Sequence, residues 1–225
     1  MIVFVDYEHQ EGRTAKWGEK ILAARTWITY RLEDLAGMPC FLTRYDRISP
    51  ELLATIDARA IFISGNGTDP SRYEPSSLAA IHSIIRTTEL PVFGFCGGFQ
   101  CIATALGSPV EPIDTDGLSS ERLAPFGGGL LGELGYHPVD LIAEHPLLDG
   151  VDARPIVRHA HYLEVPTPPS GFECLASSEV TDVQMTVDNT RRMVGTQFHP
   201  EYYTDEHPAG KQMIANFLRW AEITV

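Results

Sequence analysis

A cysteine lies at the centre of a glycine-rich heptapeptide, residues 94–100, which reads Gly-Phe-Cys-Gly-Gly-Phe-Gln. The apolar run before it, residues 90–93, predicts a buried strand, and residues 100–106 have helical character. Glycines two residues before and after Cys96 give the spacing that a sharp, strained turn needs. The helix N-terminus beyond would favour a thiolate and offer backbone N–H groups to an oxyanion. Cys96 is therefore a candidate nucleophile, and the competing interpretation is a small buried cysteine.

A second segment, residues 193–201, reads Met-Val-Gly-Thr-Gln-Phe-His-Pro-Glu and predicts a short strand that ends in a histidine and a carboxylate. A cysteine nucleophile needs a base within hydrogen-bond reach and a third group that orients the base. His199 and Glu201 can supply these two roles, and Pro200 fixes the chain between them. Their distance from Cys96 in the sequence is no obstacle, because catalytic partners meet in space.

Together the two segments resemble the class I (triad-type) glutamine amidotransferases. Residues 94–100 fit the family's nucleophile pattern, Gly-x-Cys-x-Gly-x-Gln, and residues 195–201 fit its second pattern, Gly-x-Gln-Phe-His-Pro-Glu. Residues 61–70, Ile-Phe-Ile-Ser-Gly-Asn-Gly-Thr-Asp-Pro, look like the family's oxyanion strand and loop. The similarity extends over nearly the whole chain, so one glutamine amidotransferase domain is expected over residues 1–225.

The resemblance implies a glutaminase. Cys96 would attack the side-chain amide of glutamine to give a γ-glutamyl thioester and release ammonia. His199 would move the protons in both half-reactions, and Glu201 would orient His199 and stabilise its imidazolium. The backbone N–H of Gly97 and one from the turn formed by Gly65 and Asn66 would hold the oxyanion. Removal of one such donor typically lowers the rate by about 10²–10³.

The resemblance also indicates the substrate pocket. Gln100 matches the family's substrate-contacting glutamine, and His161 and Tyr162 fall in a stretch that lies near the pocket in the family. Packing or surface exposure is an equally good interpretation of the last two. His159 and His161 can be metal ligands on one strand face, but the sequence suggests no third ligand, so neither a metal nor another cofactor is expected.

Two positions depart from the family's pattern. Gly97 stands where the family usually has a larger side chain, and Asn66 stands where the loop commonly has glycine. Asparagine tolerates a left-handed backbone better than most residues, so the turn remains plausible. Both changes bear on substrate preference and basal rate more than on the type of reaction.

Short apolar runs alternate with amphipathic stretches along the chain. Strands are predicted at residues 2–5, 41–43, 60–63 and 90–93, and helices at residues 14–35 and 77–85. This order favours an α/β fold with a doubly wound, mostly parallel sheet flanked by helices and a site at the carboxyl ends of the strands. It agrees with the flavodoxin-like fold that the resemblance implies.

The C-terminal half is richer in β signals, so additional antiparallel β structure is expected there, at residues 136–139, 155–158, 172–176 and 183–187. A closing helix is predicted over residues 208–221, and the glycines at 127–129 are predicted to form a loop. Three tryptophans fall in predicted helices and are expected to be packing residues, namely Trp17, Trp27 and Trp220.

Composition narrows the possible partners. A net charge of −13 would repel nucleic acids and anionic membranes. No apolar run approaches the length of a membrane span, and residues 1–6 are too short an apolar stretch for a signal peptide. The four cysteines lack metal-ligand spacing and suit reduced thiols in a cytoplasmic enzyme.

The fate of the ammonia is left open by the sequence. No Walker-type phosphate-binding motif is present, so the chain is expected to supply ammonia to a separate synthase or synthetase subunit. One alternative is a stand-alone hydrolase of γ-glutamyl amides that uses the same three residues. Another is a catalytically retired regulatory subunit, against which the intact triad weighs. The polar segment of residues 8–13 is expected to be a loop that gates substrate or docks a partner.

Overall fold

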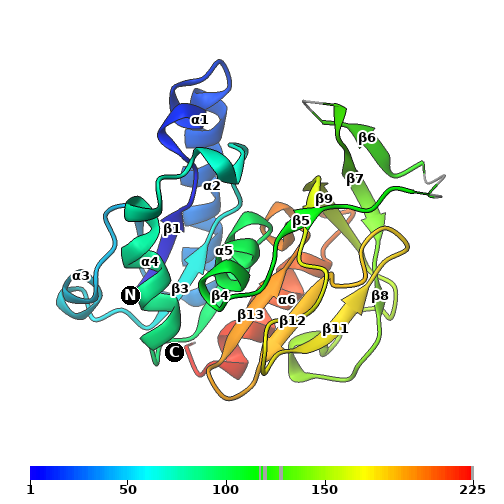
Figure 1. Ribbon diagram of the computed structural model, residues 1–225. Coiled ribbons are helices and arrows are strands. Elements are labelled where there is room, and N and C mark those ends of the chain that lie inside the picture. The colour runs from blue at the N-terminus through cyan, green and yellow to red at the C-terminus, as the bar shows by residue number, and fades with distance from the viewer. Residues whose placement is uncertain (117, 119–120, 127–128, 224–225) are drawn as a thin grey trace.

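An eight-stranded mixed sheet forms the centre of the computed structural model (Figure 1), which describes residues 1–225 except 117, 119–120, 127–128 and 224–225. The strand order is β2-β1-β3-β4-β13-β12-β11-β8. Five neighbouring strands are parallel: β1 (Ile2–Asp6), β2 (Cys40–Arg44), β3 (Ala60–Ile63), β4 (Val92–Phe95) and β13 (Met193–Thr196). Three antiparallel strands extend the sheet: β12 (Met185–Asp188), β11 (Glu173–Ser177) and β8 (Asp140–Leu141). The predicted α/β sheet and its antiparallel extension are confirmed.

Helices cover both faces of the parallel half, because its strands are apolar on both sides. Ile2 and Phe4 of β1 belong to the core under α2 (Gly18–Ala36) and α6 (Ala209–Trp220). Val3 and Val5, which point the other way, belong to the core under α3 (Pro50–Thr55), α4 (Pro75–Thr87) and α5 (Gly97–Ala105). On the first face, the ring of Phe217 lies 5.4 Å and 5.0 Å from those of Phe62 and Phe93.

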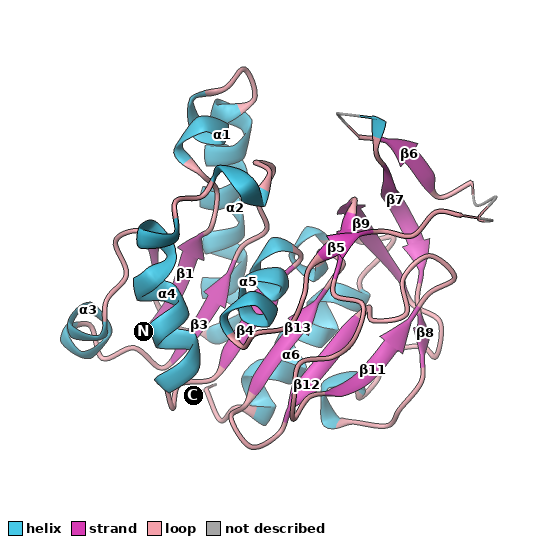
Figure 2. Cartoon of the chain, viewed as in Figure 1, coloured by secondary structure: helices cyan, strands magenta, loops and turns pink. Residues whose placement is uncertain are grey.

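Two smaller sheets are formed by strands that follow α5 in the chain (Figure 2). One contains β6 (Leu123–Pro125), β7 (Leu131–Pro138) and β9 (Ile156–His161), and the other pairs β5 (Glu111–Pro112) with β10 (Leu163–Glu164). Short 3₁₀ turns complete the described elements: η1 (Pro70–Arg72), η3 (Pro146–Leu148) and η4 (Pro200–Tyr202). Strand β9 lies at the carboxyl end of the parallel strands, where its Arg158 forms a bridge with His199.

Some predicted elements need correction. The helix expected over residues 14–35 begins at Gly18, and part of the expected loop 8–13 is a separate helix, α1 (Gln10–Thr14). Trp17 and Trp27 are 57% and 42% exposed, so their prediction as packing residues is wrong: Trp17 precedes α2, and Trp27 is not among the residues that α2 buries. The loop prediction at 127–129 falls largely on residues 127 and 128, which lie outside the described residues.

The topology brings the ends of β1, β3, β4 and β13 to one edge, because parallel strands share a carboxyl end. Asp6, Ser64, Cys96 and Gln197 stand at or just after these four ends. None of the helices in the described part of the chain is both long and apolar enough to cross a membrane.

Candidate active site

Cys96 lies in the turn between β4 and α5 with a strained backbone. Its φ of 50° and ψ of −105° are unfavourable for a residue with a side chain. The turn is held because the Cys96 N–H donates to the Thr196 carbonyl at 2.7 Å. A Cβ on Gly94 would lie 2.5 Å from the Gly98 carbonyl carbon, and one on Gly98 would lie 2.2 Å from the Ile63 oxygen. The expected elbow is confirmed, and its two glycines serve close backbone packing.

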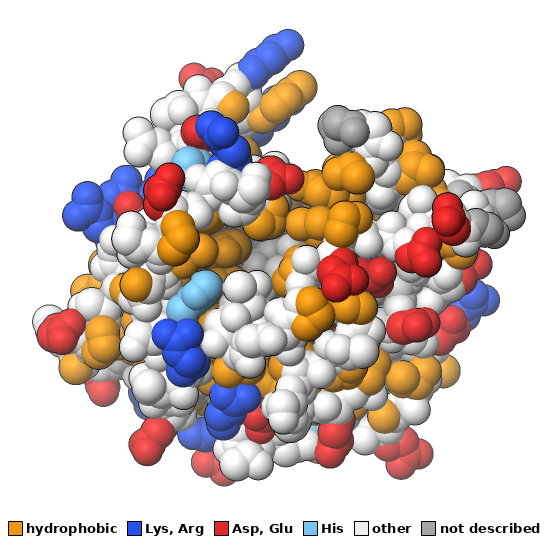
Figure 3. Space-filling view, viewed as in Figure 1, with side chains coloured by type: hydrophobic (Ala, Val, Ile, Leu, Met, Phe, Trp, Pro, Cys, Tyr) orange, Lys and Arg blue, Asp and Glu red, His pale blue; other side chains and the backbone are white. Residues whose placement is uncertain are grey.

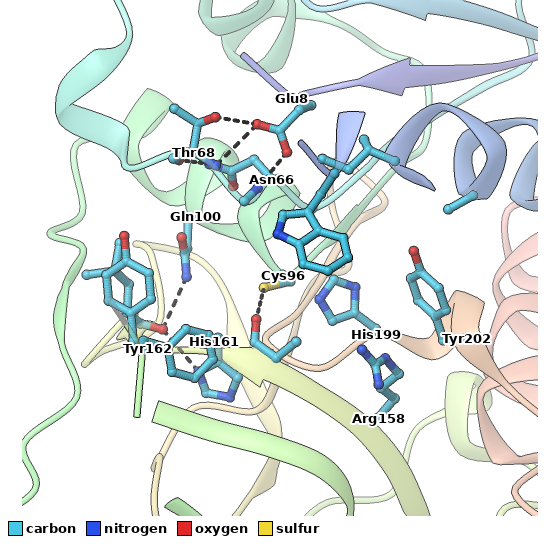
Figure 4. A pocket seen from close by; sticks show the side chains of 18 of the residues that line it. Glu8, Asn66, Thr68, Cys96, Gln100, Arg158, His161, Tyr162, His199 and Tyr202 are labelled. Carbon is cyan, nitrogen blue, oxygen red and sulfur yellow. Dashed lines mark hydrogen bonds between the residues drawn. The ribbon is translucent and has the colours of Figure 1, made fainter. Parts of the chain in front are cut away.

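His199 lies beside Cys96 at this turn (Figure 4), and Glu201 contacts the Nδ1 atom of the His199 ring. The His199 Nδ1–H donates to Glu201 Oε1 at 2.7 Å, so the other ring nitrogen remains for the Cys96 thiol, whose interaction with the ring contributes to the pKa of His199. Glu201 is 1% exposed, and among the described residues His199 is the only hydrogen-bond partner of its carboxylate. The arrangement is a thiol, a base and an orienting carboxylate in series, which can generate a nucleophile.

The charge state of His199 follows from its neighbours. Burial lowers the pKa of His199, but the charge of Glu201 and the interaction with Cys96 outweigh burial and raise that pKa to about 10. Both neighbours thus favour the imidazolium form of His199. Gln197, completely buried after β13, directs its side-chain Nε2 to the Cys96 Sγ at 3.6 Å. The Cys96 sulfur thus lies beside both the His199 ring and an amide donor (Figure 4).

The loop after β3 presents a backbone donor beside the elbow. A Cβ added to Gly97 would lie 1.8 Å from the Asn66 Oδ1 and 3.0 Å from the Asn66 nitrogen, so the two residues are in direct contact. The Asn66 N–H has no acceptor among the residues that the structure describes. Gly97 is the first residue of α5, whose N-terminal N–H groups have no partner within the helix. These two donors can receive an oxyanion formed at Cys96.

Arg25 of α2 fixes the direction of the Asn66 N–H. Its Nη2 donates to the Gly65 carbonyl at 2.7 Å, and its Nε pairs with Asp6 Oδ1 at 2.7 Å. The Ser64 hydroxyl donates to the same carbonyl at 2.8 Å. A trans peptide directs its C=O and N–H in opposite directions, so holding the Gly65 carbonyl on Arg25 turns the Asn66 N–H away from α2. Arg25 and Asp6 were not singled out as site residues from the sequence.

Glu8 holds the other end of this loop. Its carboxylate accepts hydrogen bonds from the Gly67 N–H at 2.6 Å, the Thr68 N–H at 3.1 Å and the Thr68 hydroxyl at 2.6 Å. The Gly67 N–H is therefore occupied, which leaves Asn66 as the open donor of the loop. Because Glu8 lies just before α1, the segment predicted as a gating loop is connected to the oxyanion loop by a buried carboxylate.

A cavity of about 400 Å³ opens beside Cys96, and its wall includes all three predicted substrate-binding residues. Gln100 lies across from Leu163, to whose carbonyl its Nε2 donates at 3.2 Å, and the Tyr162 hydroxyl donates to Asp69 at 3.0 Å. His161 is 3% exposed, and both nitrogens of its ring already have partners, Nδ1 in the Leu163 carbonyl and Nε2 in Glu133. A substrate role for these residues remains a prediction.

The ring of His161 belongs to a buried polar cluster behind the cavity. Glu133 Oε2 lies 3.0 Å from His159 Nδ1 and 3.2 Å from His161 Nε2, and it also accepts from the Gln184 amide at 3.0 Å. Glu133 is thus the third group with metal-ligand chemistry that the sequence did not suggest. The other carboxylate oxygen of Glu133 pairs with Arg122. The guanidinium of Arg122 neutralises the charge of this carboxylate, and the Gln184 amide supplies it with a hydrogen bond.

The mouth of the cavity is rimmed by apolar side chains. Figure 3 shows hydrophobic side chains gathered along a hollow between the α1 and α2 end of the molecule and the β6–β7 hairpin. Trp17, which contributes to the cavity wall, is among the exposed apolar residues, as are Leu131 and Leu134 of β7. Trp17, Tyr202 and Arg158 are cavity residues that sequence reasoning missed, because nothing in their local pattern distinguishes them from surface residues.

Comparison with known proteins gives one consistent family. The family model described as "Glutamine amidotransferase class-I" matches residues 24–220. A glutamine-hydrolysing GMP synthase from Symbiobacterium thermophilum is 33% identical over 162 residues, covering 71% of this chain and 27% of the relative. A glutamine-hydrolysing GMP synthase from Phenylobacterium zucineum is 31% identical over 193 residues, covering 84% of this chain and 33% of the relative. The chain thus spans about a third of the length of these relatives.

Solved structures agree on the fold. The CTPS glutaminase domain with bound acivicin from Trypanosoma brucei has a TM-score of 0.70 at 16% identity, covering 100% of this chain and 95% of that one. A glutamine amidotransferase from Thermotoga maritima has a TM-score of 0.68 at 15% identity, and each chain is 98% covered. These likenesses extend over the main sheet and its antiparallel extension alike.

The contact between Asn66 and Gly97 predicts a coupled pair of substitutions. Gly97→Ala places a methyl group on the Asn66 side chain and should lower the free energy of unfolding by about 1–3 kcal/mol, the usual result of overpacking. Asn66→Gly in the same chain should recover most of this loss, giving a coupling energy of about 0.5–3 kcal/mol in a double-mutant cycle measured by urea unfolding. Strictly additive effects would contradict the contact.

The causes of the raised His199 pKa predict how Glu201→Gln changes the reactivity of Cys96. Loss of the carboxylate charge removes the largest influence that raises the His199 pKa, so burial should pull that pKa down from about 10. A neutral His199 cannot form an ion pair with a thiolate, so alkylation of Cys96 by iodoacetamide at pH 7 should slow by about tenfold or more. Glu206→Gln, an exposed glutamate nearby, is the matched control and should leave the rate and its pH profile unaltered.

Proposed function

This chain belongs to the glutamine amidotransferase class-I family, and we propose that it hydrolyses the side-chain amide of L-glutamine and supplies the ammonia to a separate synthase or synthetase subunit. Residues 1–225 act in this proposal as one glutaminase domain. The observation that carries it is Cys96 itself, held at positive φ with an imidazolium beside its sulfur and two backbone donors beside its turn.

The first half-reaction forms a thioester. The Cys96 Sγ attacks the amide carbon, and the carbonyl oxygen becomes an oxyanion that accepts from the Asn66 and Gly97 N–H groups. His199, which holds the proton taken from the thiol, donates it to the amide nitrogen. The carbon–nitrogen bond then breaks, and ammonia leaves on the side of His199. Glu201 keeps the ring oriented throughout, because its hydrogen bond fixes the Nδ1 proton.

The second half-reaction uses the same groups in reverse. His199, now neutral, takes a proton from water, and the resulting hydroxide attacks the thioester carbon. The oxyanion forms again between the same two N–H groups. Its collapse breaks the sulfur–carbon bond, releases glutamate and returns the proton and the thiolate to the resting pair.

The relatives support a partner for this chain. A relative from Sulfolobus acidocaldarius is named as one subunit of a glutamine-hydrolysing GMP synthase. It is 32% identical over 135 residues, covering 60% of this chain and 62% of the relative. We propose by analogy that the acceptor chemistry resides in another polypeptide or domain. We also propose a cytoplasmic location, since all four cysteines are unpaired thiols.

Cys96→Ala tests the proposed reaction directly. The protein should release ammonia and glutamate from L-glutamine in equal amounts, and Cys96→Ala should abolish both, because no other group can form the thioester. Cys101→Ala is the matched control, since this buried thiol lies on the core side of α5 and should be dispensable. Release that persists in Cys96→Ala would contradict the mechanism.

Arg25→Met tests the orientation of the oxyanion donor. Without the guanidinium, the Gly65 carbonyl is free to rotate and the Asn66 N–H loses its direction, so kcat should fall by about 10²–10³ with little change in KM. Arg25→Lys can keep one of the two contacts and should give an intermediate kcat. Alkylation of Cys96 by iodoacetamide forms no oxyanion and should stay fast, whereas a parallel fall in alkylation would assign Arg25 a merely structural role.

A further inference from the structure

Arg158 places an unpaired positive charge in the wall of the catalytic cavity. It lies on β9, half-buried, and no carboxylate lies within ion-pair distance of it among the described residues. Its guanidinium lies 5.3 Å from the Tyr202 ring. By contrast, Arg25 in the same wall is paired with Asp6. In a chain with a net charge of −13, a cavity arginine without an acidic partner is a ready site for an anion.

The position of Arg158 identifies which part of a substrate it would meet. In Figure 4, Gln100 and Tyr162 lie on one side of Cys96, while His199, Arg158 and Tyr202 lie on the other. His199 must protonate the departing nitrogen, so the leaving group occupies the side of His199. The backbone carbonyl of Arg158 accepts a hydrogen bond from the backbone N–H of His199 at 2.8 Å, so β9 runs directly beside the base at this residue. Arg158 therefore faces the leaving amine instead of the glutamyl part.

The cavity is large enough for a ligand bigger than glutamine. Its volume of about 400 Å³ falls in the range of sites that hold drug-sized ligands. The cavity wall also includes Ile21 and Ala24 of α2, together with Tyr202. An apolar wall with one guanidinium suits a short carbon chain that ends in a carboxylate, which a guanidinium can bind through two parallel hydrogen bonds.

We propose that Arg158 forms a subsite for an anionic leaving group, so that the site also hydrolyses γ-glutamyl amides of amines that carry a carboxylate. This inference rests on the proposed thioester chemistry. Cys96 forms the sulfur–carbon bond as the amide carbon–nitrogen bond breaks, and His199 protonates the departing amine, whose carboxylate stays on Arg158. Water then hydrolyses the thioester, and the products are glutamate and the free amino acid.

Two ligands of nearly equal size differ in the charge of their leaving group, so comparing them isolates the contribution of the carboxylate. γ-L-Glutamylglycine carries the carboxylate, and γ-L-glutamylglycinamide replaces it with a neutral amide. The protein should show a kcat/KM about 10- to 100-fold higher for the acid, the range expected for a hydrogen bond to a charged group. Arg158→Met should bring this ratio close to one. Arg154→Met, an exposed arginine before the same strand, is the matched control and should keep the ratio.

A second measurement does not depend on turnover. Cys96→Ala cannot form the thioester, so titration calorimetry with this variant gives the affinity for each ligand, and the double variant with Arg158→Met should lose the preference for the acid. Equal affinities, or equal turnover of acid and amide, would overturn the subsite. Hydrolysis of L-glutamine without hydrolysis of γ-L-glutamylglycine would overturn it while leaving the proposed glutaminase intact, whereas failure with glutamine would count against the glutaminase.

Discussion

The strained backbone of Cys96 is the constraint on which the rest of the site depends. A non-glycine residue in this conformation costs about 1–3 kcal/mol, which the surrounding structure has to offset. The hydrogen bond to Thr196 and the tight packing of Gly94 against Gly98 supply that support from β13 and α5. Gln197 directly follows β13, and Gly97 begins α5. The interactions that stabilise the strained backbone of Cys96 therefore also position these two neighbours of its sulfur.

Two separate chains of interacting side chains lie around the Cys96 sulfur, and they have no residue in common. On one side, Glu201 orients His199 and keeps it cationic. On the other, Asp6 holds Arg25, which in turn holds the Gly65 carbonyl. In the proposed reaction, the first chain prepares the nucleophile and the second orients a donor for the oxyanion. A substitution in one chain should therefore leave the other step measurable, which is why thiol alkylation and amide turnover can be separated in this protein.

Sequence reasoning reached the triad because local patterns encode it. The glycines around Cys96 and the His-Pro-Glu ending of a strand are readable without a structure, and the apolar runs revealed the parallel strands. Arg25 and Arg158 were missed because their roles depend on which distant backbone or cavity they face. Helix α1 is too short for a periodic signal, and strands as short as β8 and β10 exist only through their pairing partners. Glu133 likewise has no marker before folding brings it to His159 and His161.

The two departures from the family's pattern, Gly97 and Asn66, lie in direct contact in the structure. A side chain at position 97 would need the space that the Asn66 amide fills, so glycine there and asparagine in the loop require each other. The Asn66 Nδ2 also donates to the Thr68 carbonyl at 2.7 Å, which stiffens a loop that glycine would leave freer. Together with Glu8 on the Gly67 and Thr68 N–H groups, this bond holds the loop from within the chain. The site should accordingly be assembled before any partner binds.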